Sequence, residues 1–252
     1  CKESIRKDLC KKQSAFLSAV TNYDNSGFTY KDVLLHFIDS FKLSFYADLE
    51  PIVWIEKTTT TEIYAVELSE VFTDAKFIHI IRDPRDNWAS LLSGWNKKYI
   101  DYNDSEQRLL QSLIERGRLG MECAKYNLEI IGPSRYKIIK FEDLTSNPEF
   151  YMRELASFIG ITFDQNLLTP TIFGYLWTGN NFDGIKTLKP STINVSRWHS
   201  RISEHDAKII EFYFRDLMEY FKYKPYFSIK ESQLAGANHY KWFNFSTPFS
   251  DK

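Results

Sequence analysis

The fold is decided by the stretch Phe77-Ile78-His79-Ile80-Ile81-Arg82-Asp83-Pro84-Arg85-Asp86-Asn87-Trp88-Ala89-Ser90. Residues 77–81 are apolar apart from His79 and β-branched at three positions, which is typical of a parallel strand covered on both faces. Asp83 is suited to cap a following helix, and Pro84 fits its first turn, where no intrahelical donor is needed. The stretch therefore predicts a strand, a charged turn and a helix.

Two polar side chains of this stretch are candidates for binding an anion. Arg82 follows the predicted strand, at the carboxyl end where open α/β sheets bind ligands. Ser90 lies about two helical turns further on, roughly 10 Å along the helix from the cap. A guanidinium and a hydroxyl near a helix start suit a phosphate-like group. The alternatives are a local ion-paired turn for Arg82 and a hydroxyl bonded back to its own helix for Ser90.

The rest of the chain alternates between predicted strands and helices. Strands are expected at 52–55, 77–81 and 136–141, and helices at about 4–21, 30–46, 62–72, 84–97, 105–130, 148–160 and 204–220. Thr61, Asn147 and Ser203 are the predicted helix caps. Residues 162–202 and the tail from Tyr226 show no regular pattern. The alternation predicts an α/β fold, in which helices flank both faces of a parallel sheet.

The composition fits one folded domain, residues 1–252. The chain is 43% hydrophobic and 16% aromatic, which argues against disorder. Its formal net charge of -1 gives no electrostatic reason to expect nucleic acid or an anionic membrane as a partner. No apolar run reaches the roughly 20 residues of a membrane span. No secretory signal is visible, and we expect a cytoplasmic protein.

No pattern indicates a metal site or a disulfide framework. Cys1, Cys10 and Cys123 are few and widely spaced, and the five histidines are isolated. We therefore expect no metal. His79 is expected to be a hydrogen-bonded histidine of the core, because it lies within a predicted strand.

Several segments, in order, resemble the sulfotransferases that use 3'-phosphoadenosine 5'-phosphosulfate (PAPS). Arg82 and Ser90 match the R-x7-S pattern of their 3'-phosphate site. Trp54-Ile55-Glu56-Lys57-Thr58 resembles the E-K-T segment of the carbohydrate, protein and bacterial branches. Residues 135–144 resemble the family strand that ends in YEDL, and Ser196-Arg197-Trp198 resembles the late S-[RK]-W segment. The resemblance covers about residues 50–225.

The resemblance implies a three-layer, P-loop-type parallel sheet flanked by helices, with PAPS as sulfuryl donor and adenosine 3',5'-bisphosphate as product. Lys57 would be the catalytic lysine near the transferred sulfonate. Arg82, Ser90 and Arg197 would bind the 3'-phosphate, and Phe141 would lie near the adenine, where many relatives have a tyrosine. The alternatives are an exposed lysine, an apolar strand residue for Phe141 and a locally paired Arg197.

The implied acceptor is a hydroxyl or amine of a carbohydrate or small molecule. The aromatic residues of 162–202 suit stacking on a sugar or packing on an aliphatic chain, and they equally suit an ordered core loop. Trp177 and Trp198 are candidates for lining the acceptor cleft. Trp88 and Trp95 are expected in the core.

Two features depart from the family pattern. No G-x-x-[KR]-[ST]-G-[ST] stretch occurs in the sequence, so we expect the 5'-phosphosulfate loop, with its strand and helix, to lie upstream of Cys1. A membrane anchor in such a segment would favour the Golgi lumen as an alternative location. Thr59 stands where the cytosolic small-molecule branch has its histidine base, so the histidine mechanism is not expected here. No other residue is assigned as the base.

Two other classes of function compete with sulfuryl transfer. One is a non-catalytic binding module on the same scaffold, which would need no phosphosulfate loop. The other is a P-loop kinase, which would need a Walker-type loop and magnesium ligands, and the sequence shows neither.

Overall fold

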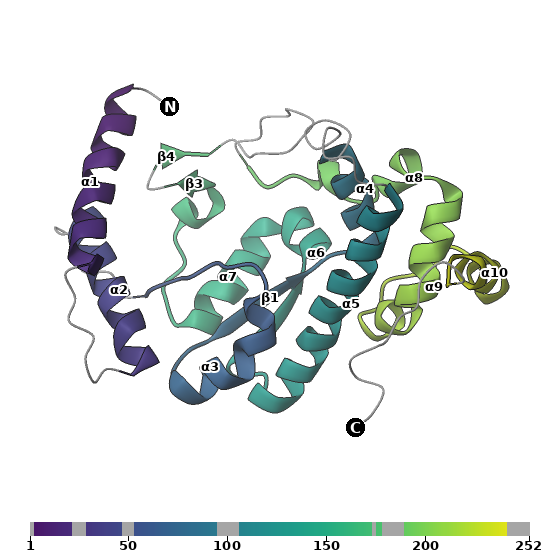
Figure 1. Cartoon of the computed structure of the whole chain (residues 1–252), viewed down its shortest axis with the longest axis horizontal. Helices are drawn as coiled ribbons and strands as arrows, with labels where there is room; N and C mark the ends of the chain where they lie inside the picture. The colour runs from purple at the N-terminus through teal and green to yellow at the C-terminus, as the bar shows by residue number, and fades with distance from the viewer. Residues whose placement is uncertain are drawn as a thin grey trace. The chain divides into compact units, whose positions relative to one another are not determined.

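The computed structural model describes residues 3–21, 29–46, 53–94, 106–172, 175–177 and 189–240 (Figure 1). The chain divides into two compact units, residues 1–59 and residues 60–252. The expectation of one sulfotransferase-like domain over 1–252 stays a prediction.

The first unit is built on two helices, α1 (Glu3–Thr21) and α2 (Tyr30–Phe45), which pack together. Thr29 caps α2: its hydroxyl accepts the backbone N–H of Asp32, and the Asp32 carboxylate accepts the N–H of Thr29. The rings of Phe16 and Phe37 meet edge to face across the pair, with centroids 4.9 Å apart. Both helices lie where the sequence predicts them.

The prediction of a strand at 52–55 is wrong for residues 53–55, the part that the structure describes. Residues 53–58 form neither helix nor strand, and all of them are exposed. A strand needs a neighbour for its backbone hydrogen bonds, and no described residue pairs with this segment.

The second unit contains a two-stranded parallel sheet of β1 (Phe77–Ile81) and β2 (Tyr136–Lys140). Phe77 pairs with Tyr136 and Ile81 with Lys140, so both strands end at the same edge. The long helix α5 (Glu106–Ile131) packs along both strands (Figure 1), and α6 (Phe141–Ser146) contacts β2. This is a mixed α/β arrangement around a small parallel sheet, as the alternating pattern predicts.

The sequence predicts that both faces of β1 are covered, and this is wrong for the described residues: one face is exposed. Ile81 is buried, whereas Ile80 is 51% exposed and Ile78 is 37% exposed. The apolar run therefore identifies a strand correctly, although it does not report how each face is covered.

The core lies between α4 (Pro84–Gly94), α5 and α9 (Glu204–Tyr220). Trp88 of α4 is fully buried there, as predicted, together with Ile114 and Phe214. Gly117 allows α5 to approach α9 closely, because a Cβ at this position would lie 3.0 Å from the Phe214 ring. The core thus packs α4 against both α5 and α9.

The remaining elements are η1 (Thr61–Tyr64), α3 (Ala65–Val71), α7 (Pro148–Ile159), η4 (Gln165–Leu168), β3 (Thr171–Ile172), β4 (Tyr175–Leu176), η5 (Thr192–Asn194), α8 (Trp198–Arg201) and α10 (Ile229–Tyr240). The caps predicted at Asn147 and Ser203 are confirmed, since their side chains accept backbone N–H groups. The cap predicted at Thr61 is wrong: Thr60 precedes η1, in a left-handed conformation and without a side-chain cap bond. Trp95 lies outside the described residues. None of the described helices combines the length and apolar character needed to cross a membrane.

Candidate active site

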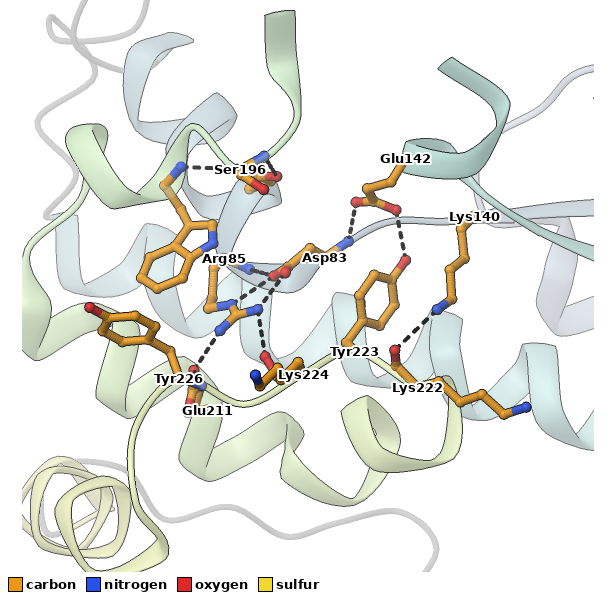
Figure 2. A network of polar contacts seen from close by, with 12 residues as sticks. Asp83, Arg85, Lys140, Glu142, Ser196, Glu211, Lys222, Tyr223, Lys224 and Tyr226 are labelled. Carbon is orange, nitrogen blue, oxygen red and sulfur yellow. Dashed lines mark hydrogen bonds and ion pairs between the residues drawn. The ribbon is translucent and has the colours of Figure 1, made fainter. Parts of the chain in front are cut away.

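The turn after β1 is held by a buried ion-paired network (Figure 2). The Asp83 carboxylate accepts the backbone N–H of Arg85 at 2.9 Å, so it caps α4 as predicted. It also binds the Arg85 guanidinium, which reaches the buried Glu211 of α9 on its other side. Glu142 of α6 accepts the backbone N–H of Asp83 at 2.8 Å and the Tyr223 hydroxyl at 3.0 Å. The network fixes the turn against α6 and α9.

The sequence allows a local ion pair in this turn as the alternative role of Arg82. In the structure, Arg85 forms that ion pair. Arg85 pairs with Asp83 at 2.6 Å, and both side chains are almost fully buried. Burial lowers the pKa of Arg85, but hydrogen bonds and charge from Asp83 and Glu211 outweigh it, so the pKa is raised overall.

Arg82 lies at the carboxyl end of β1, as predicted. Its Nη2 donates to the Asn194 carbonyl at 2.6 Å, and its guanidinium lies 4.6 Å from the centre of the Phe141 ring. Its Nε is buried and has no hydrogen-bond partner among the described residues. Burial lowers the pKa of Arg82. The nearby carboxylates, of which Asp86 has the largest effect, oppose this shift. The site therefore holds a cation with an unused donor, which suits an anion.

Arg197 joins Arg82 through a single residue. Its Nη1 donates to Oδ1 of Asn194, whose carbonyl accepts from Arg82. Repulsion from Arg197 is among the effects that lower the pKa of Arg82. The structure thus brings together three residues predicted for nucleotide binding: Arg82, Phe141 and Arg197.

The sequence predicts that Phe141 is the last residue of a strand, and this is wrong. β2 ends at Lys140, and Phe141 opens the short helix α6. This places its ring beside the Arg82 guanidinium at the sheet edge.

Ser90 and Lys57 have different surroundings. Ser90 is exposed on α4, about two turns after the cap. Lys57 is exposed too, and it belongs to the first unit. The roles assigned to both residues stay predictions.

A pocket of about 190 Å³ lies where the end of β1 meets α4 and α5. Arg82 and Asn87 contribute polar groups from one side and Arg116 from α5, while Met121 and Phe214 supply apolar walls. The pocket adjoins the proposed anion site through Arg82.

His79 is a hydrogen-bonded residue of the sheet, as predicted. Its Nδ1 lies 2.7 Å from the Tyr136 hydroxyl, and Asn127 donates to the same hydroxyl. Burial lowers the pKa of His79 and raises the pKa of Tyr136 to about 12.

Sequence reasoning missed Asp86 and Asn194. The Asp86 carboxylate accepts the backbone N–H groups of Ser196 and Trp198, and so joins α4 to the segment that carries Arg197. The repeated acidic residues of Arg82-Asp83-Pro84-Arg85-Asp86 were a visible signal for Asp86. Nothing in the sequence near Asn194 indicates its two contacts.

Comparison with known proteins identifies the family. A model of the sulfotransferase family matches residues 11–165, more than half of the chain. That range includes Lys57, Arg82, Ser90 and Phe141. Carbohydrate sulfotransferase 3 of Mus musculus is 25% identical over 166 residues, covering 60% of this chain and 34% of that protein. Omega-hydroxy-beta-dihydromenaquinone-9 sulfotransferase Stf3 of Mycobacterium tuberculosis is 27% identical over 129 residues, covering 48% and 32%.

The chain spans about a third of the length of these curated relatives. Among solved structures, the sulfotransferase domain from the curacin biosynthetic pathway aligns with a TM-score of 0.56 over 84% of this chain and 78% of its own. At 18% identity, this likeness supports the fold alone. The family model matches residues 11–165, which is more than half of the chain, so the chain belongs to the sulfotransferase family.

Proposed function

We propose that this protein transfers a sulfuryl group from PAPS to a hydroxyl or amine acceptor and releases adenosine 3',5'-bisphosphate. The observation that carries the proposal is Arg82 at the end of β1, with a buried Nε that lacks a partner and with Arg197 attached to the same Asn194. Two guanidinium groups beside an aromatic ring suit a nucleotide that carries a 3'-phosphate.

Each nucleotide-binding residue has a distinct part in the proposal. Arg82 and Arg197 donate charge-assisted hydrogen bonds to the 3'-phosphate, and the Ser90 hydroxyl adds one from α4. Phe141 offers ring surface to the adenine but lacks a tyrosine's hydroxyl. PAPS supplies the activated sulfuryl group, and no metal is required in this proposal.

Lys57 is proposed as the catalytic residue. When the bond from sulfur to the phosphate oxygen breaks, negative charge grows on that bridging oxygen and on the sulfonate. A lysine ammonium donates to these oxygens as a mobile point charge. The new bond forms between sulfur and the acceptor oxygen or nitrogen, whose proton passes to solvent. Lys57 therefore contributes mainly to the transition state.

We further propose the complete sheet as a three-layer, P-loop-type parallel sheet flanked by helices, in one domain that spans 1–252. The parallel pairing of β1 and β2 and the packing of α5 against both strands support it. The structural neighbour, a sulfotransferase domain, is consistent with this arrangement.

The acceptor is proposed to be a carbohydrate or another small molecule. The two curated relatives are named for a carbohydrate and for a menaquinone derivative. Trp177, after β4, is 39% exposed, and Leu176 is 65% exposed, so the end of β4 offers apolar surface for stacking. Trp198 is buried against Arg85 and does not serve as acceptor surface.

The test is incubation of the full-length protein with PAPS labelled in the sulfuryl group and a panel of hydroxyl and amine acceptors. Label on an acceptor supports the proposal. Binding of adenosine 3',5'-bisphosphate without transfer to any acceptor favours the non-catalytic binding module. Phosphoryl transfer from ATP, with no use of PAPS, favours the kinase and contradicts the proposal.

A further inference from the structure

Asp86 is a buried carboxylate that holds a distant segment by its backbone. It lies in the first turn of α4 and is 1% exposed. One oxygen accepts the N–H of Ser196 at 2.6 Å, and the other accepts the N–H of Trp198 at 3.0 Å. Burial raises the pKa of Asp86, and the two backbone donors partly offset this effect. Both donors are needed, because a buried carboxylate without hydrogen bonds is strongly destabilising.

The segment that Asp86 holds is sharply bent. Ser196 has a φ of 56°, in the left-handed region that residues with a Cβ rarely adopt. Its N–H is the group that Asp86 accepts, so the carboxylate stabilises a conformation that the chain alone disfavours. Trp198 is buried, and the Arg85 guanidinium lies 4.4 Å from its ring centre. The segment is therefore fixed on both sides of Arg197.

The fixed segment presents Asn194 and Arg197 to Arg82. The Asn194 carbonyl accepts from Arg82, and its side-chain oxygen accepts from Arg197. A neutral residue thus connects two like charges. Such a pair favours a ligand with two negative charges, because each guanidinium otherwise repels the other.

We propose that Asp86 is a positioning residue for the 3'-phosphate of the nucleotide: by anchoring Ser196 and Trp198, it holds Arg197 and Asn194 beside Arg82. This inference rests on the proposed function, because it needs the arginines to bind a 3'-phosphate. Asp86 acts through the segment alone. Its own negative charge would repel a phosphate, so direct contact with the ligand is not part of its role.

The test compares two nucleotides that differ only in the 3'-phosphate. The variant Asp86→Asn keeps the size of the side chain but leaves one acceptor oxygen for two N–H donors. Calorimetry on the full-length protein gives the affinities for adenosine 3',5'-bisphosphate and adenosine 5'-monophosphate. We expect the preference for the bisphosphate to fall about tenfold or more, the scale of one charged hydrogen bond. Affinity for the monophosphate should stay within about twofold.

The control is Met218→Ala. Met218 of α9 is fully buried in the core between α4, α5 and α9, and its truncation leaves a cavity there. This variant should lose stability on a similar scale while it keeps the preference for the bisphosphate. The comparison separates positioning of Arg197 from a general weakening of the fold.

A second variant, Asn194→Ala, keeps Asp86 and the carbonyl that Arg82 uses, but removes the contact to Arg197. It should reduce the same preference by about three- to tenfold, and it serves if Asp86→Asn does not fold. A wild-type protein that binds both nucleotides equally overturns the 3'-phosphate site, and this inference with it. Two other results overturn the inference about Asp86 but leave the 3'-phosphate site standing. One is that Asp86→Asn or Asn194→Ala keeps the wild-type preference for the bisphosphate. The other is that a variant loses affinity for both nucleotides equally.

Discussion

Arg82 is a cation in a place where burial works against its charge. Burial lowers its pKa, and the carboxylates of Asp86, Glu142 and Asp83 oppose that effect without an ion pair to Arg82 among the described contacts. Its Nε remains without a partner there. A hydrogen bond from a desolvated donor of this kind to an anion is stronger than one from an exposed donor, because the local dielectric constant is low.

We expect Arg82→Ala to weaken binding of adenosine 3',5'-bisphosphate by about 1.5–3 kcal/mol, the range for a charged hydrogen-bonded pair. Ser90→Ala should have a smaller effect, because the hydroxyl carries no charge of its own, whereas the guanidinium does. Titration calorimetry measures both. Unchanged affinity in a correctly folded Arg82→Ala protein would sink the assignment of this site.

Lys57→Ala is expected to separate chemistry from binding. An interaction made only in the transition state lowers kcat and kcat/KM together. Affinity for adenosine 3',5'-bisphosphate should fall less than kcat, because this product keeps the former bridging oxygen but lacks the sulfonate. Steady-state kinetics on an identified acceptor, with product binding as the control, measure the difference. Normal turnover in the variant would exclude the catalytic role.

His79 should make the fold sensitive to acid. Its folded-state pKa is lowered by burial, so below the ordinary value of 6.5 the unfolded chain takes up a proton that the folded protein still excludes. The free energy of unfolding therefore decreases as the pH is lowered through the window just below about 6.5. His79→Asn should flatten this fall, as seen in urea midpoints from about pH 7 to pH 5. Parallel curves for the two proteins would contradict it.

At the scale of elements, the sequence predicts best where a local pattern and its caps agree. β1 and α4 were found from an apolar run followed by Asp83-Pro84, and α9 from Ser203. The helix α10 was missed, although Ser228 and Glu231 form a reciprocal capping box that the sequence spells as S-x-x-E. The strand expected at 52–55 failed because a short apolar run does not reveal whether a neighbouring strand exists.

The cap of α9 offers a direct test at this scale. The Ser203 side chain accepts the backbone N–H of Asp206 at 3.0 Å. Ser203→Ala should lower the free energy of unfolding by about 0.5–2 kcal/mol, while Ser203→Asp should preserve most of it. Urea denaturation measures both variants. An Asp variant as unstable as the Ala variant would show that capping is not the cause.

Across the whole molecule, the site depends on contacts that no local pattern reports. Asp86 meets Ser196 across 110 positions, and Arg85 meets Glu211 across 126. Arg82, Ser90 and Arg197 are predicted as nucleotide-binding residues because each belongs to a short motif. Asp86 and Asn194 were missed because their contacts depend on how distant segments fold together.

Glu211 is the residue through which α9 stabilises this arrangement. Its carboxylate binds Arg85 (Figure 2) and accepts two backbone N–H groups, and the side chain is fully buried. Glu211→Ala should reduce the free energy of unfolding by about 3–5 kcal/mol, because it leaves buried donors without an acceptor. The control is Glu204→Ala on the exposed face of the same helix, expected to lose no more than about 1 kcal/mol. Thermal or urea unfolding distinguishes them.

The bend at Ser196 has a consequence for how sequences of this family vary. A backbone with φ of 56° accepts glycine, asparagine or aspartate most readily, and rejects β-branched residues. The acceptor of its N–H is the acid at position 86, so the two positions are expected to change together during evolution. In an alignment, an aspartate at 86 should accompany a small or left-handed-tolerant residue at 196. Lineages that lose the acid should also lose the bend, and with it the spacing from 194 to 198 that places Asn194 and Arg197.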